Sequence, residues 1–233
     1  MSGHSKWATT KRAKAAIDAK RSSLFTKLSK NISVAARAGA DPDTNFKLRM
    51  AIDKARVLNM PKDNIERAIK KGSGESGGQI ESLLYEGFGP GGVALVIEVL
   101  TDNKNRTVSN LKHILSKHGG SFANEGSVRW MFDTKGQIFL KQDILSEDEE
   151  LKIIEAGAED ILTDDGVKVI TAFDSLEKVK NNLQTHGFVV ESSEIVYIAK
   201  DKVNHEDSEQ LIKLLDDLDD DDDVNNIYTN TDI

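Results

Sequence analysis

The stretch DILTDDGVKVIT at residues 160–171 predicts a β-hairpin, because two short runs rich in β-branched residues flank the turn Asp164-Asp165-Gly166. On each side of this hairpin the chain shows one helix pattern and, farther out, one strand pattern. These elements are predicted at residues 137–140 and 147–155 before the hairpin, and at 176–185 and 188–198 after it. The order β-α-β-β-α-β is that of the ferredoxin-like split unit, so residues 133–202 are predicted to form one α+β domain.

A second α+β unit is predicted from the segments that surround this domain. It begins with two strands joined by a glycine-rich turn, then a helix and a third strand (Ile80–Tyr85, Gly87–Gly92, Val93–Leu100, Asn105–His118 and Ser127–Phe132). A helix at about 206–218 and a strand at 224–228 complete this unit if the chain returns to it. The predicted fold is therefore α+β multidomain, with two ferredoxin-like domains. The first of them is discontinuous, at 79–132 plus 203–233, and the other is inserted in it.

The first 78 residues predict a basic helical domain that ends in a linker. From Leu24 to Ala36 the apolar residues recur every three or four positions, which is typical of one side of a helix. Two more helices are predicted at about Asn45–Leu58 and Pro61–Gly72. In the last of these, the Asp63–Arg67 and Glu66–Lys70 pairs have the spacing of ion pairs. The glycines and serines that follow, up to residue 78, are typical of a flexible linker.

Charge is divided unequally along the chain. Residues 1–72 hold 17 Lys and Arg against 6 Asp and Glu, a net charge of +11, whereas residues 73–233 hold 14 against 33, a net charge of −19. The total of −8 hides this division. A strongly basic segment favours a polyanion partner, which indicates nucleic acid. The alternative is that the basic segment docks on the acidic remainder of the same chain, and both interpretations stay open.

Candidate nucleic-acid contacts are concentrated in the first 38 residues, which contain nine cations and one acidic residue, Asp18. Several cations on one face suit phosphate binding, because each neutralised phosphate releases counterions. Trp7 could stack on a base or pack against the helical domain. The predicted contacts are Lys6, Trp7, Lys11, Arg12, Lys14, Lys20, Arg21, Lys27, Lys30 and Arg37.

A possible secondary phosphate contact is predicted at Lys104 and Arg106, where a strand passes into a helix. The exposed amide groups at a helix start attract anions, and these two cations lie beside them. The alternative is that Asn105 caps the helix and both cations are ordinary surface charges. The residues show no set typical of base-edge recognition, so they do not predict sequence-specific binding to DNA.

The sequence predicts no enzyme, no catalytic residue, no metal and no cofactor. Cysteine is absent, and none of the five histidines has the spacing of a metal-binding pair. The turn Gly87–Gly92 fits G-x-G-x-x-G by letter, but a strand follows it, so it does not predict a dinucleotide site. The longest apolar run, Val93–Ile97, is too short to span a membrane, and the basic N-terminus lacks the apolar core of a signal peptide. We expect a cytoplasmic protein with no membrane partner, and its oligomeric state is left open.

Longer motifs resemble the YebC family along the whole chain. The clearest are SGHSKWA at residues 2–8, NMPKDNIERAIKKG at 59–72 and YEGFGPGGV at 85–93. The resemblance implies a three-domain protein, with a helical N-terminal domain and two α+β domains, and neither enzymatic activity nor a cofactor. Members are described as probable transcriptional regulators that bind DNA. Mitochondrial relatives act as translational activators, and bacterial relatives are tied to ribosomes stalled on proline-rich stretches.

Two hypotheses follow from this resemblance and from the charge. The first is a DNA-binding regulator of transcription, and the alternative is a ribosome-associated translation factor that binds ribosomal RNA. The chain departs from the family pattern at residues 10–14, where Ile-Lys-His-Arg-Lys is common, and at Thr229, where His is common. The basic count barely changes, so electrostatic binding is still expected, whereas contacts of those histidines are not carried over.

Overall fold

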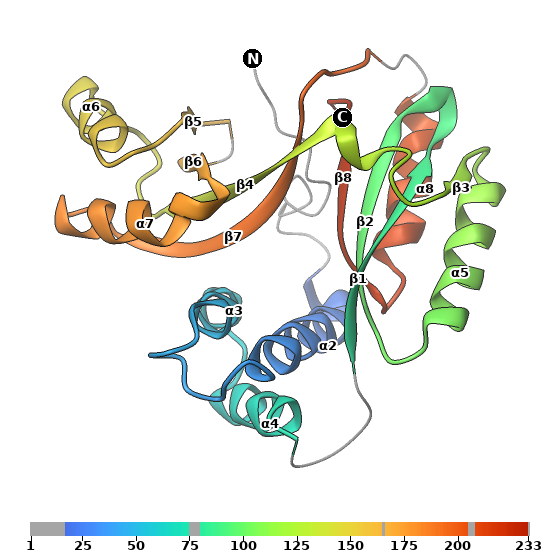
Figure 1. Cartoon of the computed structure of the whole chain (residues 1–233), viewed down its shortest axis with the longest axis horizontal. Helices are drawn as coiled ribbons and strands as arrows, with labels where there is room; N and C mark the ends of the chain where they lie inside the picture. Colours follow the sequence, from blue (N-terminus) through green and yellow to red (C-terminus); the bar gives the residue numbers. More distant parts are fainter. Residues whose placement is uncertain (1–16, 75–79, 165, 205–207, 233) are drawn as a thin grey trace.

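The computed structural model describes residues 17–74, 80–164, 166–204 and 208–232, and it begins with three helices (Figure 1). They are α2 (Ile17–Ala36), α3 (Phe46–Val57) and α4 (Lys62–Gly72), so the three predicted helices are present. Asn45 precedes α3, and its side chain accepts a hydrogen bond from the Leu48 amide. Gly72 is required at the end of α4, because a Cβ there would lie 2.1 Å from the Ser33 carbonyl oxygen of α2.

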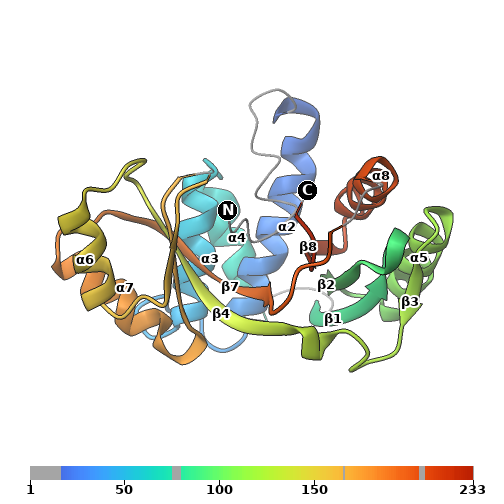
Figure 2. The same ribbon diagram turned by 90° about the horizontal axis from the view of Figure 1, so that it is seen from above.

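A four-stranded antiparallel sheet, sheet A, is built from two separate parts of the chain. Its strands lie in the order β3-β1-β2-β8, and β8 pairs with β2 although the two lie far apart in sequence. Two helices, α5 and α8, lie side by side on this sheet and cover Leu95, Ile97 and Val99 (Figure 2). The elements are β1 (Glu81–Phe88), β2 (Ala94–Thr101), α5 (Lys104–Lys117), β3 (Ser121–Ala123), α8 (Ser208–Asp219) and β8 (Val224–Thr229).

A second antiparallel sheet, sheet B, is built from the continuous segment between β3 and α8. Its order, β5-β6-β4-β7, is the ferredoxin-like one, and α6 and α7 pack on it. The elements are β4 (Phe132–Leu140), α6 (Glu147–Glu155), β5 (Asp160–Leu162), β6 (Lys168–Ala172), α7 (Leu176–Thr185) and β7 (Val190–Ala199). The chain thus has N-terminal helices and two four-stranded sheets, which confirms the predicted α+β multidomain class.

The strand predicted at Ser127–Phe132 is wrong. The third strand of sheet A is β3, and Arg129–Met131 form a short 3-10 turn before β4 begins at Phe132. The buried carboxylate of Glu86 in β1 accepts hydrogen bonds from the backbone amides of Gly126 at 2.7 Å and Arg129 at 2.9 Å, and also from that of Val128. Burial acts to raise the pKa of Glu86, but these three donors lower that pKa below its ordinary value. In a strand, neighbouring amides such as those of Val128 and Arg129 point to opposite edges, so the backbone must turn here for both to reach one carboxylate.

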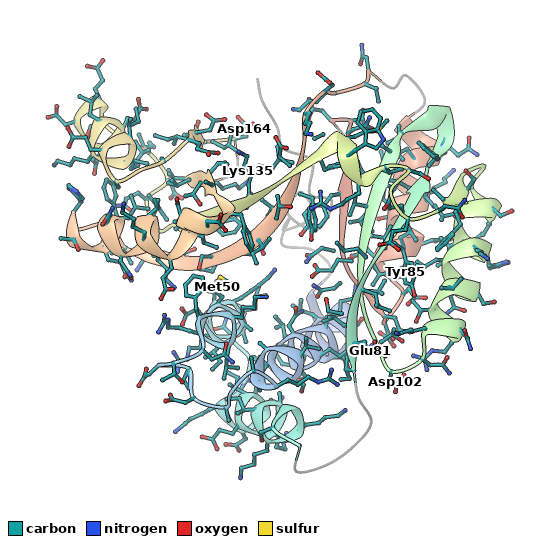
Figure 3. All side chains as sticks on the ribbon, viewed as in Figure 1. Met50, Glu81, Tyr85, Asp102, Lys135 and Asp164 are labelled. Carbon is teal, nitrogen blue, oxygen red and sulfur yellow. The ribbon has the colours of Figure 1, made fainter. Side chains whose placement is uncertain are left out.

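The two sheets and the helices meet in one continuous structure. Val96 and Tyr228 of sheet A are buried against Val196 of β7, and the rings of Tyr228 and Tyr197 meet edge to face at 5.1 Å. On the other side, α3 packs against β7 and brings Met50 into the core of sheet B (Figure 3). The helical domain therefore contributes an apolar side chain to the core of sheet B.

Candidate nucleic-acid interface

The structure describes only part of the predicted basic contact set. Lys6, Trp7, Lys11, Arg12 and Lys14 lie outside the described residues. Lys20 and Arg21 belong to the first turns of α2, and their side chains also lie outside the description. The side chains of Lys27, Lys30 and Arg37 are described, and they differ in what they contact.

Lys27 and Lys30 bind the acidic turn, residues Asp219–Asp223, which joins α8 to β8. The Lys27 ammonium donates to the Asp219 carbonyl and lies 3.3 Å from Asp219 Oδ1. The Lys30 ammonium donates to the Asp222 carbonyl and to Asp223 Oδ1, both at 2.8 Å. The two lysine side chains are only 12% and 18% exposed. Both cations are thus engaged by the chain's own acidic part, whereas Arg37 is exposed and forms no ion pair with a described residue.

Helix α3 docks on sheet B in the same way. Lys54 lies 2.7 Å from Glu194 of β7, and Asp53 lies 3.2 Å from the buried Lys180 of α7. Intramolecular docking of the basic domain on the acidic sheets, one of the two interpretations of the charge division, is therefore realised among the described residues. It uses part of the positive charge and leaves other cations exposed.

The Asp223 carboxylate joins the helical domain to the start of α5. It lies 2.8 Å from Lys30 of α2 and 2.8 Å from Arg106 of α5, and its side chain is 5% exposed. The hydroxyl of Thr107 donates to it at 2.8 Å and that of Thr101 at 3.2 Å. Burial acts to raise the pKa of Asp223, but the donors from Lys30, Arg106 and Thr107 lower this pKa to about 2. The carboxylate is therefore ionised at neutral pH.

The two residues of the predicted secondary phosphate contact, Lys104 and Arg106, bind different acidic side chains. Lys104 lies 2.8 Å from Glu81 of β1, while Arg106 lies 3.0 Å from Asp102 and also binds Asp223. Glu81 and Asp102 sit at the end of sheet A that is nearest to the helical domain (Figure 3). The helix is capped by the Asn103 side chain, which accepts from the Arg106 amide at 3.1 Å, and not by Asn105.

A groove of about 550 Å³ lies between α2, α4 and the connection from β2 to α5. We call it the cationic groove, because Lys30, Arg67, Lys71 and Arg106 line it against one carboxylate, Asp102. Along α2, hydroxyl side chains recur on the side that faces it, at Ser22, Thr26, Ser29 and Ser33. Their spacing of three and four residues places them on one face of the helix. The Ser33 hydroxyl already donates to the Ala68 carbonyl and the Thr26 hydroxyl to the Ser22 carbonyl. Phosphate oxygens accept hydrogen bonds from hydroxyl and cationic donors, so the cations, together with Ser22 and Ser29, make this lining suit a phosphate-rich ligand.

Two cations of the groove were missed by the sequence reasoning, which predicted an ion pair from Asp63 to Arg67. Arg67 instead donates to the backbone carbonyl of Asp63 at 3.3 Å and to the side-chain oxygen of Asn64. Lys71, one turn later on α4, is exposed. The predicted Glu66–Lys70 pair is likewise absent among the described residues, where Glu66 lies 3.6 Å from Lys62. The periodic hydroxyls of α2 were the sequence signal that could have indicated this face.

The described residues contain no group of three or more His, Asp or Glu side chains placed to hold a metal ion. None of the described helices is long and apolar enough to cross a membrane.

Models of one protein family match almost the whole chain. A model described as "TACO1/YebC protein N-terminal domain" matches residues 5–75, and one described as "TACO1/YebC second and third domain" matches residues 80–231.

Curated relatives carry the name of a probable transcriptional regulatory protein. One from Thermosipho melanesiensis is 51% identical over 239 aligned residues, which cover 100% of this chain and 94% of the relative. One from Dehalococcoides mccartyi is 49% identical and covers 100% of this chain and 95% of the relative. The crystal structure of a conserved hypothetical protein from Aquifex aeolicus is similar in fold, with a TM-score of 0.88 and 43% identity over 97% of this chain and 96% of that chain.

Proposed function

Because this chain belongs to the TACO1/YebC family, we propose that it is a non-enzymatic, nucleic-acid-binding regulator of gene expression whose cationic groove holds a phosphate backbone. The relatives' name of probable transcriptional regulatory protein puts DNA first among the nucleic acids. No step of the proposed function requires a cofactor or a chemical reaction.

The observation that carries the proposal is the convergence of cations from three helices on one groove. Lys30 comes from α2, Arg67 and Lys71 from α4, and Arg106 from α5, with the hydroxyl face of α2 between them. Lys30 and Arg106 share the Asp223 carboxylate, so most of the net positive charge comes from Arg67 and Lys71. Contacts of this kind hold and orient a nucleic acid without selecting its bases.

The N-terminal cations extend the same proposed interface. Residues 6–21 lead directly into Ser22, which lines the groove, so we propose that Lys6, Lys11, Arg12, Lys14, Lys20 and Arg21 contact phosphates beyond it. Trp7 is proposed to stack on a base, and Arg37 to add an exposed charge. Lys27 is assigned to docking of the acidic turn instead, because its ammonium already binds Asp219.

Substitution of Arg67 and Lys71 by glutamate tests this proposal. Both side chains are exposed, so the double variant R67E/K71E should keep the fold, which is checked by thermal unfolding. Fluorescence anisotropy with a labelled duplex of about 30 base pairs should show affinity reduced at least tenfold near 0.1 M salt. If the wild type neutralises about four phosphates, its log affinity falls with log salt at a slope near −3 to −4, and the variant's slope is shallower.

The matched control is K141E/K178E, which makes the same charge change at two exposed lysines near sheet B. We expect it to bind the duplex within about twofold of the wild type, because long-range charge effects are screened by salt. Equal losses in the two variants would mean that only net charge matters. An unchanged affinity of R67E/K71E would remove the cationic groove from the interface.

A further inference from the structure

Helix α6 carries an apolar face that sheet B does not cover. The side chains of Leu151 and Ile154 are each 58% exposed, and Ile144, just before the helix, is 85% exposed. Leu151 and Ile154 are three residues apart and therefore neighbours on the helix surface. Scattered exposed aliphatic residues are ordinary, but here three lie within eleven positions of the chain, and two of them are neighbours on one helix.

This apolar face is not needed for the fold. The inner side of α6 is complete, because Ile153 and Ala156 are buried in the core of sheet B. The start of the helix is fixed by a capping box, in which Ser146 and Glu149 each bind the other's backbone amide. The outward side chains are thus held on a rigid helix and remain available for contact with another molecule.

Carboxylates surround the two aliphatic side chains. Glu147 and Glu155 lie one turn before and after Leu151, and Glu150 lies one turn before Ile154. Residues 141–160 as a whole hold eight Asp and Glu against two Lys, a net charge of −6. Nucleic acid and other polyanions would be repelled by this surface.

We infer that the outer face of α6 docks a basic amphipathic segment of a protein partner. Leu151, Ile154 and Ile144 would contact its apolar side, and Glu147, Glu150 and Glu155 would pair with lysine or arginine at the rim. An apolar centre with a charged rim is the usual arrangement of a protein interface. Both views place α6 at the opposite end of the molecule from sheet A, away from α4 (Figures 1 and 2). Protein and nucleic acid could therefore be bound at the same time.

The test uses the full chain and a labelled synthetic peptide of about 18 residues, with leucines on one helix face and lysines on the other. The reference is a peptide of the same composition whose leucines are spread around the helix. We expect the amphipathic peptide to bind more tightly in anisotropy measurements, and the variant L151S/I154S to weaken it at least tenfold. The fold should be unaffected, because both side chains are largely exposed.

Two further comparisons test whether the loss of peptide affinity is specific to α6. The variant V203S removes an exposed aliphatic side chain elsewhere and should leave the affinity unchanged. E147Q/E155Q should weaken binding and reduce its salt dependence, whereas E125Q/D201N, at exposed acids outside α6, should not. Equal affinity for both peptides, or no effect of L151S/I154S, would overturn the inference. A change of oligomeric state in L151S/I154S, measured by light scattering, would also overturn it, because a second copy of the chain would then cover the face.

Discussion

The carboxylate of Asp223 connects the helical domain to sheet A through two cations, Lys30 and Arg106. We expect D223N to lower the free energy of unfolding by about 2–4 kcal/mol at pH 7, because it leaves the largely buried Lys30 ammonium and the half-exposed Arg106 guanidinium without their shared counter-charge. Urea unfolding of the full chain measures this difference. D201N, at an exposed aspartate, is the control and should change stability by no more than about 0.5 kcal/mol.

The pH dependence of this loss follows from the direction of the pKa shift. The pKa of Asp223 is lowered in the folded protein from 3.8 to about 2, so the unfolded state binds the proton more readily. The contribution is fully present above pH 4 or so and disappears as the pH falls toward 2. The stability difference between wild type and D223N should therefore shrink over that window. A difference that stays constant down to pH 2 would mean that the charge of Asp223 is not its cause.

At the scale of elements, α2 presents two kinds of cation. Lys27 and Lys30 are largely buried against the acidic turn, while Arg37 is exposed, as is Lys47 of α3. K27E/K30E would place two new carboxylates beside those of Asp219 and Asp223. We expect this variant to be destabilised by about 3 kcal/mol or more. R37E/K47E makes the same change in net charge and should cost less than about 1 kcal/mol. Similar unfolding midpoints for the two variants would show that the acidic turn does not hold α2.

The helices and most strands could be predicted because their signals are local. The periodicity of Leu24–Ala36, the start of the second helix near Asn45 and the hairpin at residues 160–171 each depend on neighbours within a few positions. The turn at Arg129–Met131 could not be predicted this way, because the Glu86 carboxylate that holds it lies about forty residues earlier in the chain. Its apolar residues resemble a strand until that partner is known.

At the scale of the whole molecule, the candidate site likewise depends on contacts between residues far apart in the sequence, which local patterns do not predict. Charge counting identified the basic third, but it could not separate Lys27, whose partner Asp219 lies 192 residues away, from cations that stay exposed. Arg67 and Lys71 become a site only because α4 lies beside α2 and the start of α5. Composition therefore predicts a class of ligand, while which of the described cations are exposed depends on how the three parts are packed.

The division of charge over the whole molecule leads to a prediction about which nucleic acid is bound. Cations of the groove suit phosphates and carry no base-edge pattern, and the acidic sheets on either side would be repelled by long duplex DNA. We therefore expect modest affinity for duplex DNA with little discrimination between sequences. A folded RNA bordered by basic proteins could bind the groove through the RNA and the acidic parts through the proteins.

Crosslinking in cells, followed by sequencing of both nucleic acids, decides between DNA and ribosomal RNA as the bound nucleic acid. R67E/K71E is the control that should lose the crosslinking signal. Enrichment of ribosomal RNA would support the ribosome-associated alternative, whereas recovery of one short DNA motif with negligible ribosomal RNA would contradict it and support transcriptional regulation.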